Sequence, residues 1–416
     1  MKRLVFAAAA LMISTPLGAV PIAITGATVW TMAKDSPLED ATILIDHGQI
    51  LSIETHGQVP NNAIRISADH RIVTPSLVDA ATQIGLGEVG GIDEERRGRV
   101  DSGPLGAAFN VAYGFDAEDQ AVRQARADGV GWAMIYPDGS AKAPFDGTAA
   151  RVALGADEAR IERSKAAMLV TIGGSSASRV GGSTAAAWQL LRNALDDSKT
   201  LVPRSPNRAQ DRLTGRLDVA ALKPVLEGSM PLIIQCDRLS DIRQAISLAR
   251  DYHLKLIIFG GAEAWAAAHE LAEAKIPVIL DPMASLPDSY DRIGSRADSA
   301  ALLAAQGVRL AFSVSAQGIY RTWDAGPSMR EGAGLAVASG LSYAAALRAI
   351  TSGAAEIIGL PPSVGRLRPG AQADLVIWDG DPLEPSSGPV LVMIGGEKVS
   401  LVTRQTLLRD RYAPGR

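Results

Sequence analysis

The stretch TPSLVDAATQIG, residues 74–85, stands where the pattern of the chain changes. Before it, short apolar runs at 22–30, 41–45 and 50–54 are separated by polar turns, which predicts a small all-β unit. From about residue 71 onward, apolar runs are followed by helical stretches. The quoted stretch is therefore expected to be the first strand of a second, α/β unit.

The same strand-then-helix pattern repeats after residue 85. Apolar runs occupy 131–136, 166–172, 231–236, 254–259, 276–280 and 308–314. Continuously apolar strands that alternate with helices predict a parallel sheet covered on both faces. About 280 residues of this pattern favour a (β/α)8 TIM-like barrel. A doubly wound open sheet is the alternative, but no Gly-rich dinucleotide fingerprint follows any of these strands.

Strand character returns at the C-terminal end of the chain. Residues 365–379 read as a strand, and Gly395-Gly396 before Lys398-Val399 reads as a hairpin. We expect these strands to pair with the N-terminal ones. The predicted organisation is a composite β-sandwich from residues 20–73 and 361–416, around a barrel from 74–360.

The composition and the N-terminal residues indicate which classes of binding partner and which cellular compartment to expect for this protein. The 416 residues are 47% hydrophobic and 21% charged with a net charge of −4, so nucleic acid is not an expected partner. Lys2-Arg3, the apolar run 4–13 and the small residues 15–19 are typical of a signal peptide cleaved near Ala19. That run is too short to span a bilayer, and no later segment reads as a membrane span. The mature protein is expected to be periplasmic or secreted.

Three motifs resemble the amidohydrolase superfamily, especially its imidazolonepropionase-like branch. Residues 73–79 resemble the entry into the first barrel strand, 41–50 the N-terminal strand-turn-strand, and 365–378 (GRLRPGAQADLVIW) the closing motif. The resemblance covers nearly the whole chain after the leader. It implies a TIM-like barrel with a β-sandwich, bound zinc, and hydrolysis of non-peptide carbon–nitrogen bonds.

The chain departs from the family at the positions that would hold the metal. The first strand of the family reads Asp-x-His-x-His, whereas Ala81 and Gln83 stand at the two histidine positions. On strands five and six the histidine positions fall on Gln235 and on Phe259 or Gly260. Ser315 falls on the aspartate position of strand eight. Alanine has no donor atom and an amide is a poor zinc ligand, so we expect no zinc and no other cofactor.

The polar residues left at the strand ends are the candidate site. The catalytic candidates are Asp79, Glu88 and Asp237; the candidates for substrate binding are Gln83, Gln235, Arg238, Ser315 and Arg321. Each has a structural alternative: Asp79 as a brace of the neighbouring turn, Glu88 as part of a solvated charged loop, and Asp237 paired with Arg238. Cys236 reads more readily as a buried thiol than as a nucleophile.

Three functions are compatible with these residues. The first is a metal-independent or non-catalytic amidohydrolase homologue, in a homo-oligomer or beside an active paralogue. The second is a hydrolase of cyclic amides or imides that uses carboxylates in place of a metal-bound hydroxide. The third is a solute-binding protein without turnover.

Overall fold

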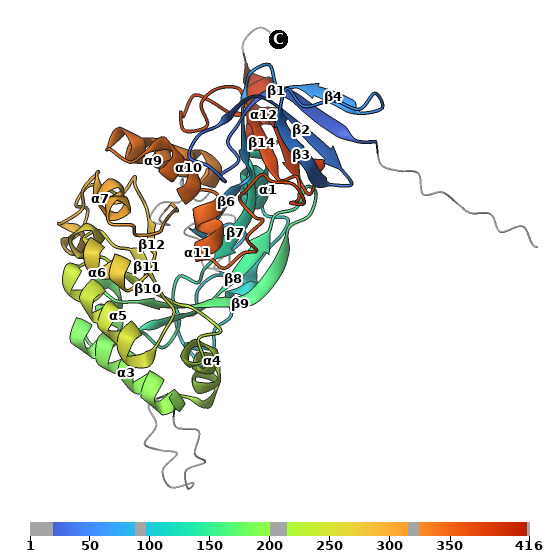
Figure 1. Ribbon diagram of the computed structural model, residues 1–416. Coiled ribbons are helices and arrows are strands. Elements are labelled where there is room, and N and C mark those ends of the chain that lie inside the picture. The colour runs from blue at the N-terminus through green and yellow to red at the C-terminus, as the bar shows by residue number, and fades with distance from the viewer. Residues whose placement is uncertain (1–19, 88–96, 200–213, 315–323, 414–416) are drawn as a thin grey trace, which may run out of the picture.

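The computed structural model describes residues 20–87, 97–199, 214–314 and 324–413. The predicted leader and the residues Glu88, Ser315 and Arg321 lie outside these ranges. The described chain forms two eight-stranded sheets, one built from both ends of the chain and one that curves into a nearly closed barrel (Figure 1). Among the described residues, no helix combines the length and apolar character needed to cross a membrane.

The first sheet joins segments that are far apart in sequence. Strand β14 pairs antiparallel with β5, with Ile377 opposite Val73 and Leu375 opposite Pro75. A tight hairpin joins β2 to β3 through His47 and Gly48, both at positive φ, as such turns require. Its strands are β1 (Ile22–Val29), β2 (Leu38–Asp46), β3 (Gln49–Thr55), β4 (Ile64–Ser67), β5 (Ile72–Pro75), β14 (Leu375–Trp378), β15 (Pro389–Ile394) and β16 (Glu397–Lys398). A helix that the sequence did not indicate, α12 (Arg404–Tyr412), follows.

The second sheet is a TIM-like barrel of mixed rather than wholly parallel strands. Its order along the sheet is β6 (Leu77–Thr82), β7 (Val130–Ile135), β8 (Phe145–Ala153), β9 (Arg160–Thr171), β10 (Leu232–Cys236), β11 (Leu256–Gly260), β12 (Val278–Leu280) and β13 (Leu310–Phe312). Strands β6 and β13 approach each other through Ser313, whose hydroxyl donates to the Ala81 carbonyl and lies 3.1 Å from Asp79 Oδ1.

Most of the helices cover the outside of the barrel, whereas α11 packs against its interior cluster. Those after the central strands are α3 (Thr184–Lys199), α4 (Arg216–Leu226), α5 (Leu239–Tyr252), α6 (Ala268–Glu273) and α7 (Ser299–Ala305). Shorter or later ones are α1 (Gln120–Ala127), α2 (Gly174–Arg179), α9 (Ala325–Ala338), α10 (Tyr343–Ala349) and α11 (Ser352–Ile357). Figure 1 shows α3, α5, α6 and α7 along one side of the barrel, away from the composite sheet.

The expectation of a wholly parallel barrel was wrong at one strand. β8 runs antiparallel to both β7 and β9, and the sequence pattern predicts no strand there. Asp146, Gly147 and Arg151 interrupt the apolar pattern of this strand, yet all nine of its residues are buried. The two charges are buried because each has a partner: Asp146 pairs with Arg179, and Arg151 with Glu162.

Side chains that point into the barrel form a separate apolar cluster. It contains Ala81, Tyr136, Leu169, Ile233 and Phe259 together with residues of α11 and the turn after it. Side chains of the same strands that point outward, such as Ile135 and Cys236, pack under the helices. This alternation decides which residues at the strand ends can face a ligand.

Candidate functional site

The carboxyl ends of the parallel strands form the mouth of the barrel, where enzymes of this architecture hold their reactive groups. Because β8 runs the other way, its first residues lie at this end. The centre of the mouth is apolar: the rings of Tyr136 and Phe259 pack edge to face, with centroids 5.3 Å apart. Ala81 belongs to the same cluster and is 2% exposed.

The side chains at the expected metal positions do not fit a zinc ion. Ala81 and Phe259 have no donor atom, and Gln235 offers only a neutral amide. All five histidines of the chain, at positions 47, 56, 70, 253 and 269, are exposed, and none lies at the carboxyl end of a barrel strand. Within the part of the chain that the structure describes, no three His, Cys, Asp or Glu side chains cluster closely enough to hold a metal.

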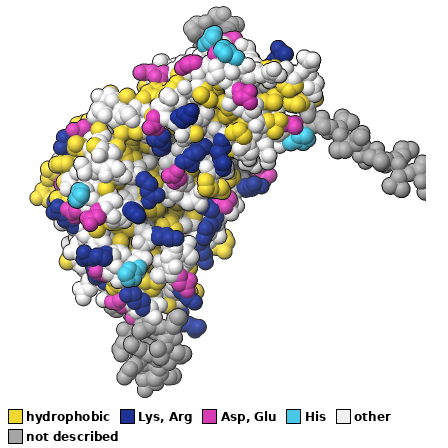
Figure 2. Space-filling view, in the orientation of Figure 1, with side chains coloured by type: hydrophobic (Ala, Val, Ile, Leu, Met, Phe, Trp, Pro, Cys, Tyr) yellow, Lys and Arg dark blue, Asp and Glu magenta, His cyan; other side chains and the backbone are white. Residues whose placement is uncertain are grey.

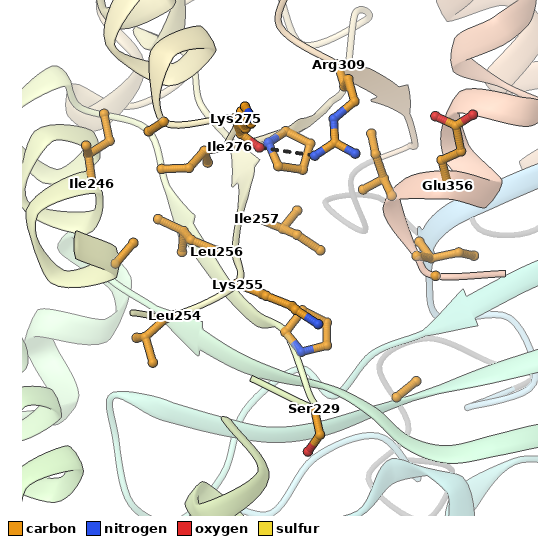
Figure 3. Close-up of a pocket in the computed structure, with 18 of the residues that line it drawn as sticks. Ser229, Ile246, Leu254, Lys255, Leu256, Ile257, Lys275, Ile276, Arg309 and Glu356 are labelled. Carbon is orange, nitrogen blue, oxygen red and sulfur yellow. Dashed lines mark hydrogen bonds between the residues drawn. The ribbon is translucent and has the colours of Figure 1, made fainter. Parts of the chain in front are cut away.

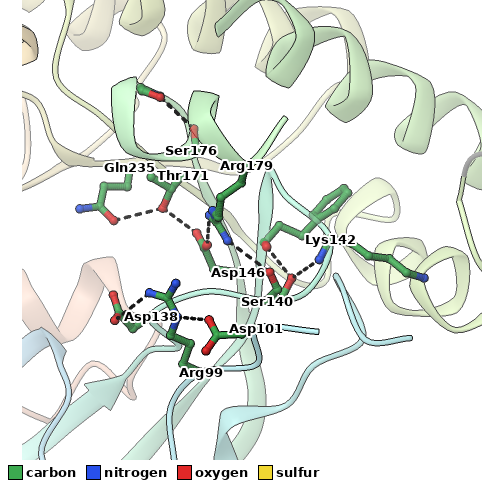
Figure 4. A network of polar contacts seen from close by, with 12 residues as sticks. Arg99, Asp101, Asp138, Ser140, Lys142, Asp146, Thr171, Ser176, Arg179 and Gln235 are labelled. Carbon is green, nitrogen blue, oxygen red and sulfur yellow. Dashed lines mark hydrogen bonds and ion pairs between the residues drawn. The ribbon is translucent and has the colours of Figure 1, made fainter. Parts of the chain in front are cut away.

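A partly buried polar network lies beside this apolar centre (Figure 4). Asp146 of β8 accepts a hydrogen bond of 2.6 Å from the Thr171 hydroxyl and one of 3.0 Å from the Arg179 guanidinium. The Thr171 hydroxyl also lies 3.3 Å from the amide oxygen of Gln235, at the end of β10. One carboxyl, one guanidinium and one amide therefore meet at the ends of β8, α2 and β10.

Burial raises the pKa of Asp146 from 3.8 to about 6, although Thr171 and Arg179 both favour the ionised form. A carboxyl that titrates near pH 6 can exchange a proton at neutral pH, as a general acid or base must. Asp146 was not among the candidate site residues predicted from the sequence, because Asp146-Gly147 is typical of a turn. The approach of Arg179, which comes from another element, has no local sequence signal.

Asp237 and Arg238 do not pair with each other as expected. The Asp237 carboxylate accepts from the Ala262 backbone N–H at 3.0 Å and lies 3.9 Å from Arg292. Arg238 instead reaches Asp291 at 3.2 Å and stacks over the Tyr290 ring. The reason is the segment after β12, which places one residue of opposite charge beside each of the two.

A cavity of about 60 Å³ brings two of the predicted site residues together. Gln235 and Asp237 line it at the end of β10, with Phe259 of β11, Asp281 and Arg292. Burial raises the pKa of Asp237. The space is enough for a few water molecules or one small substituent of a ligand.

Asp79 lies outside this constellation. It stands opposite Ala133, which packs under the helices, so its carboxylate faces away from the barrel interior. It accepts from the Ala81 backbone N–H at 3.3 Å and from the Ser313 hydroxyl at 3.1 Å. Both contacts hold the backbone next to Asp79 in place, which is what a structural rather than a catalytic role of Asp79 requires. Gln83 follows the end of β6 and is partly buried.

Cys236 is not placed for nucleophilic chemistry. Its side chain is 2% exposed and packs in the outer apolar cluster. Burial and the neighbouring carboxylates raise the pKa of the thiol well above its usual value, which disfavours the thiolate.

Comparison with known proteins extends these observations. Residues 236–399 match the sequence model described as the amidohydrolase family. Amidohydrolase tasK of Hapsidospora irregularis is 23% identical over 433 residues, which cover 91% of this chain and 43% of that protein. The chain thus spans less than half the length of this curated relative.

Solved structures share the fold. An amidohydrolase from Thermotoga maritima MSB8 superposes with a TM-score of 0.79 at 24% identity, over 91% of this chain and 99% of that one. N-isopropylammelide isopropylaminohydrolase from Burkholderia multivorans ATCC 17616 gives a TM-score of 0.51 at 16% identity, over 91% and 98% of the two chains.

Proposed function

The chain belongs to the amidohydrolase superfamily, and we propose that it is a member that binds a small amide or imide at the barrel mouth without a histidine-held metal. The observation that carries the proposal is the apolar centre of the mouth. Phe259 stands at an expected ligand position and packs against Tyr136, and Ala81 stands at another.

The polar side chains beside this centre suit an amide. Gln235 can pair with an amide through its own donor and acceptor, and Arg179 can donate to a carbonyl oxygen. A member without metal cannot lower the pKa of a bound water in the family's manner, so binding without turnover is the primary proposal. Such a protein serves as a solute receptor or as the partner subunit of an active paralogue.

Elemental analysis of the purified protein tests this proposal. We expect far less than one zinc per chain, and no change in the thermal unfolding midpoint on treatment with a chelator. A zinc protein of known stoichiometry, carried through the same purification, controls for metal loss. One zinc per chain, together with destabilisation by the chelator, would contradict the proposal.

A second function is favoured by the pKa of Asp146. The carboxylate can take a proton from a water whose oxygen forms a bond to the amide carbon. The C–N bond then breaks, and the leaving nitrogen receives the proton that Asp146 holds. Glu88 and Asp237, which the sequence indicated, are alternative bases for the same step.

A screen of cyclic amides and imides separates the two functions. If the protein hydrolyses one of them, Asp146→Asn should lower kcat by roughly 100-fold or more. Glu88→Gln and Asp237→Asn remove the charge of the two alternative bases, so the variant that loses activity identifies the base. An unchanged rate in Asp146→Asn would remove this residue from the mechanism. Thermal stabilisation by an amide with no turnover would instead support the binding role.

A further inference from the structure

A pocket of about 900 Å³ opens at the end of the barrel opposite the mouth (Figure 3). It is lined by residues that precede or begin strands β9 to β13, by Arg151 of β8, by residues of α5 and α6, and by the end of α11 and the turn after it. None of the residues assigned to the mouth lines it. Enzymes with a TIM barrel hold their catalytic residues at the carboxyl ends of the strands, which is the other end of this barrel. A ligand in this pocket would therefore have a role other than that of the substrate at the mouth.

Basic residues stand where three neighbouring strands begin. Lys255 and Lys275 each lie three residues before the paired positions Ile258 and Val278, so they stand at the same level of the sheet. Arg309 immediately precedes β13, whose Leu310 pairs with Val278. Adjacent strands are ~4.8 Å apart, and Arg309 stands level with Pro277, two residues beyond Lys275, so the three backbone positions span ~12 Å.

These three side chains have no carboxylate within ion-pair distance among the described residues. Arg309 donates to the Lys275 carbonyl at 3.1 Å, which is a neutral partner. Of the three acids that line the pocket, Glu270 pairs with Arg243 and Glu356 with Arg366, whereas Glu273 has no ion pair among the described residues. The three unpaired cations therefore outnumber the one unpaired carboxylate, and the pocket keeps an excess of positive charge.

The floor between these cations is apolar. Ile257 and Ile358 line the pocket, are 3% and 4% exposed, and belong to the cluster that fills the barrel interior. Figure 3 shows Lys255, Lys275 and Arg309 around Ile257. On the face seen in Figure 2, Lys and Arg side chains likewise lie among apolar surface.

We propose that this pocket binds an organic phosphate monoester, with the phosphate among Lys255, Lys275 and Arg309 and an apolar body against Ile257 and Ile358. A phosphate dianion concentrates its charge on one group, which matches three cations on adjacent strands. Inorganic phosphate would leave the apolar floor uncovered, and a neutral ligand would leave the cations unpaired. The inference does not depend on what binds at the mouth.

Isothermal titration with phenyl phosphate tests the site. We expect it to bind more tightly than inorganic phosphate or benzyl alcohol, and more weakly as salt rises, because the ammonium groups are exposed. The triple variant Lys255→Gln/Lys275→Gln/Arg309→Gln should weaken binding by about tenfold or more. Thermal unfolding of the variant would verify that it is folded.

A matched triple variant distinguishes binding in the pocket from nonspecific attraction of an anion to a positively charged protein. Lys34→Gln/Arg65→Gln/Lys398→Gln removes the same charge from exposed positions in the composite-sheet region, and binding should change by less than about twofold because these positions are remote. Asp146→Asn should leave binding intact. Equal weakening in both triples, no binding to the wild type, or loss of binding in Asp146→Asn would each overturn the proposal.

Discussion

At the scale of single residues, Asp79, the aspartate of the first-strand motif, affects the stability of the fold. Its carboxyl is 1% exposed, and burial raises its pKa from 3.8 to about 7. In the unfolded chain the group ionises near pH 4, so between pH 4 and pH 7 the folded state holds more protons. The contribution of Asp79 to stability therefore falls as pH rises through this window.

Replacing Asp79 with Asn should remove that dependence. The amide oxygen keeps an acceptor for the Ser313 hydroxyl and the Ala81 N–H, while the charge is removed. At pH 8 we expect the free energy of unfolding to rise by roughly 1–4 kcal/mol, since one pKa unit corresponds to about 1.4 kcal/mol. Urea unfolding at pH 5 and pH 8 would measure it.

The control for this prediction is Asp79→Ala. It removes the charge and also the acceptor, so Ser313 and Ala81 lose their partner and the variant should be destabilised at pH 5. A stability difference between Asp79→Asn and wild type that is the same at both pH values would show that Asp79 does not titrate in this window.

At the scale of elements, the segment 281–298 after β12 ties several strand ends together. Its Asp291 accepts from the Gly174 backbone N–H at 2.6 Å and pairs with Arg238 at 3.2 Å. The Gly294 carbonyl accepts from the Trp265 indole at 3.0 Å. The segment thereby contacts the residues that follow β9, β10 and β11, at the rim of the mouth.

Asp291→Ala should loosen this rim. The variant loses the ion pair with Arg238 and leaves the Gly174 N–H without its acceptor, which should cost about 1–2 kcal/mol. Hydrogen–deuterium exchange should then accelerate in residues 173–180 and 284–298. Asp288→Ala is the matched control, because its pair with Arg292 is half exposed on the Asp288 side and is worth little. Equal exchange rates in Asp291→Ala and Asp288→Ala would show that Asp291 does not hold the segment 281–298 against the other strand ends.

Some of the strands could be predicted from the sequence and others could not. Strands such as β10 and β11 were predicted because they are apolar on both faces and end in a turn. That Ala81 and Gln83 replace metal ligands at the end of β6 stays a prediction. β8 could not be predicted, because its charges are neutralised by partners from α2 and β9. The same long-range pairing hid Asp146, and the true partners of Asp237 and Arg238 depend on a segment more than 50 residues away.

At the scale of the whole molecule, Arg330 connects the barrel to the composite sheet. It lies on α9, is 3% exposed, and donates to the carbonyls of Pro382 at 2.8 Å and Ser387 at 3.0 Å. Its guanidinium also stacks over the ring of Trp378 on β14, 4.8 Å from the centroid. One side chain thus satisfies two buried carbonyls of the loop that leaves the sheet.

Arg330→Met should weaken this connection. Two carbonyls lose their donor and the cation–π contact is lost, for an expected cost of about 2–4 kcal/mol. Scanning calorimetry should show a lower unfolding midpoint. Arg330→Lys should lose nearly as much, since an ammonium cannot reproduce the planar fork. The exposed Arg368→Met is the control, and an equal midpoint in Arg330→Met and Arg368→Met would refute the role.

The reversed strand β8 has one more consequence. Asp146 near its start belongs to the mouth network, whereas Arg151, five residues later, lines the basic pocket at the opposite end of the barrel. At ~3.4 Å per residue these two positions are separated by ~17 Å of one hydrogen-bonded strand. The two ends could influence each other's affinity only through a displacement of β8, and thermodynamic linkage would make any such effect equal in both directions.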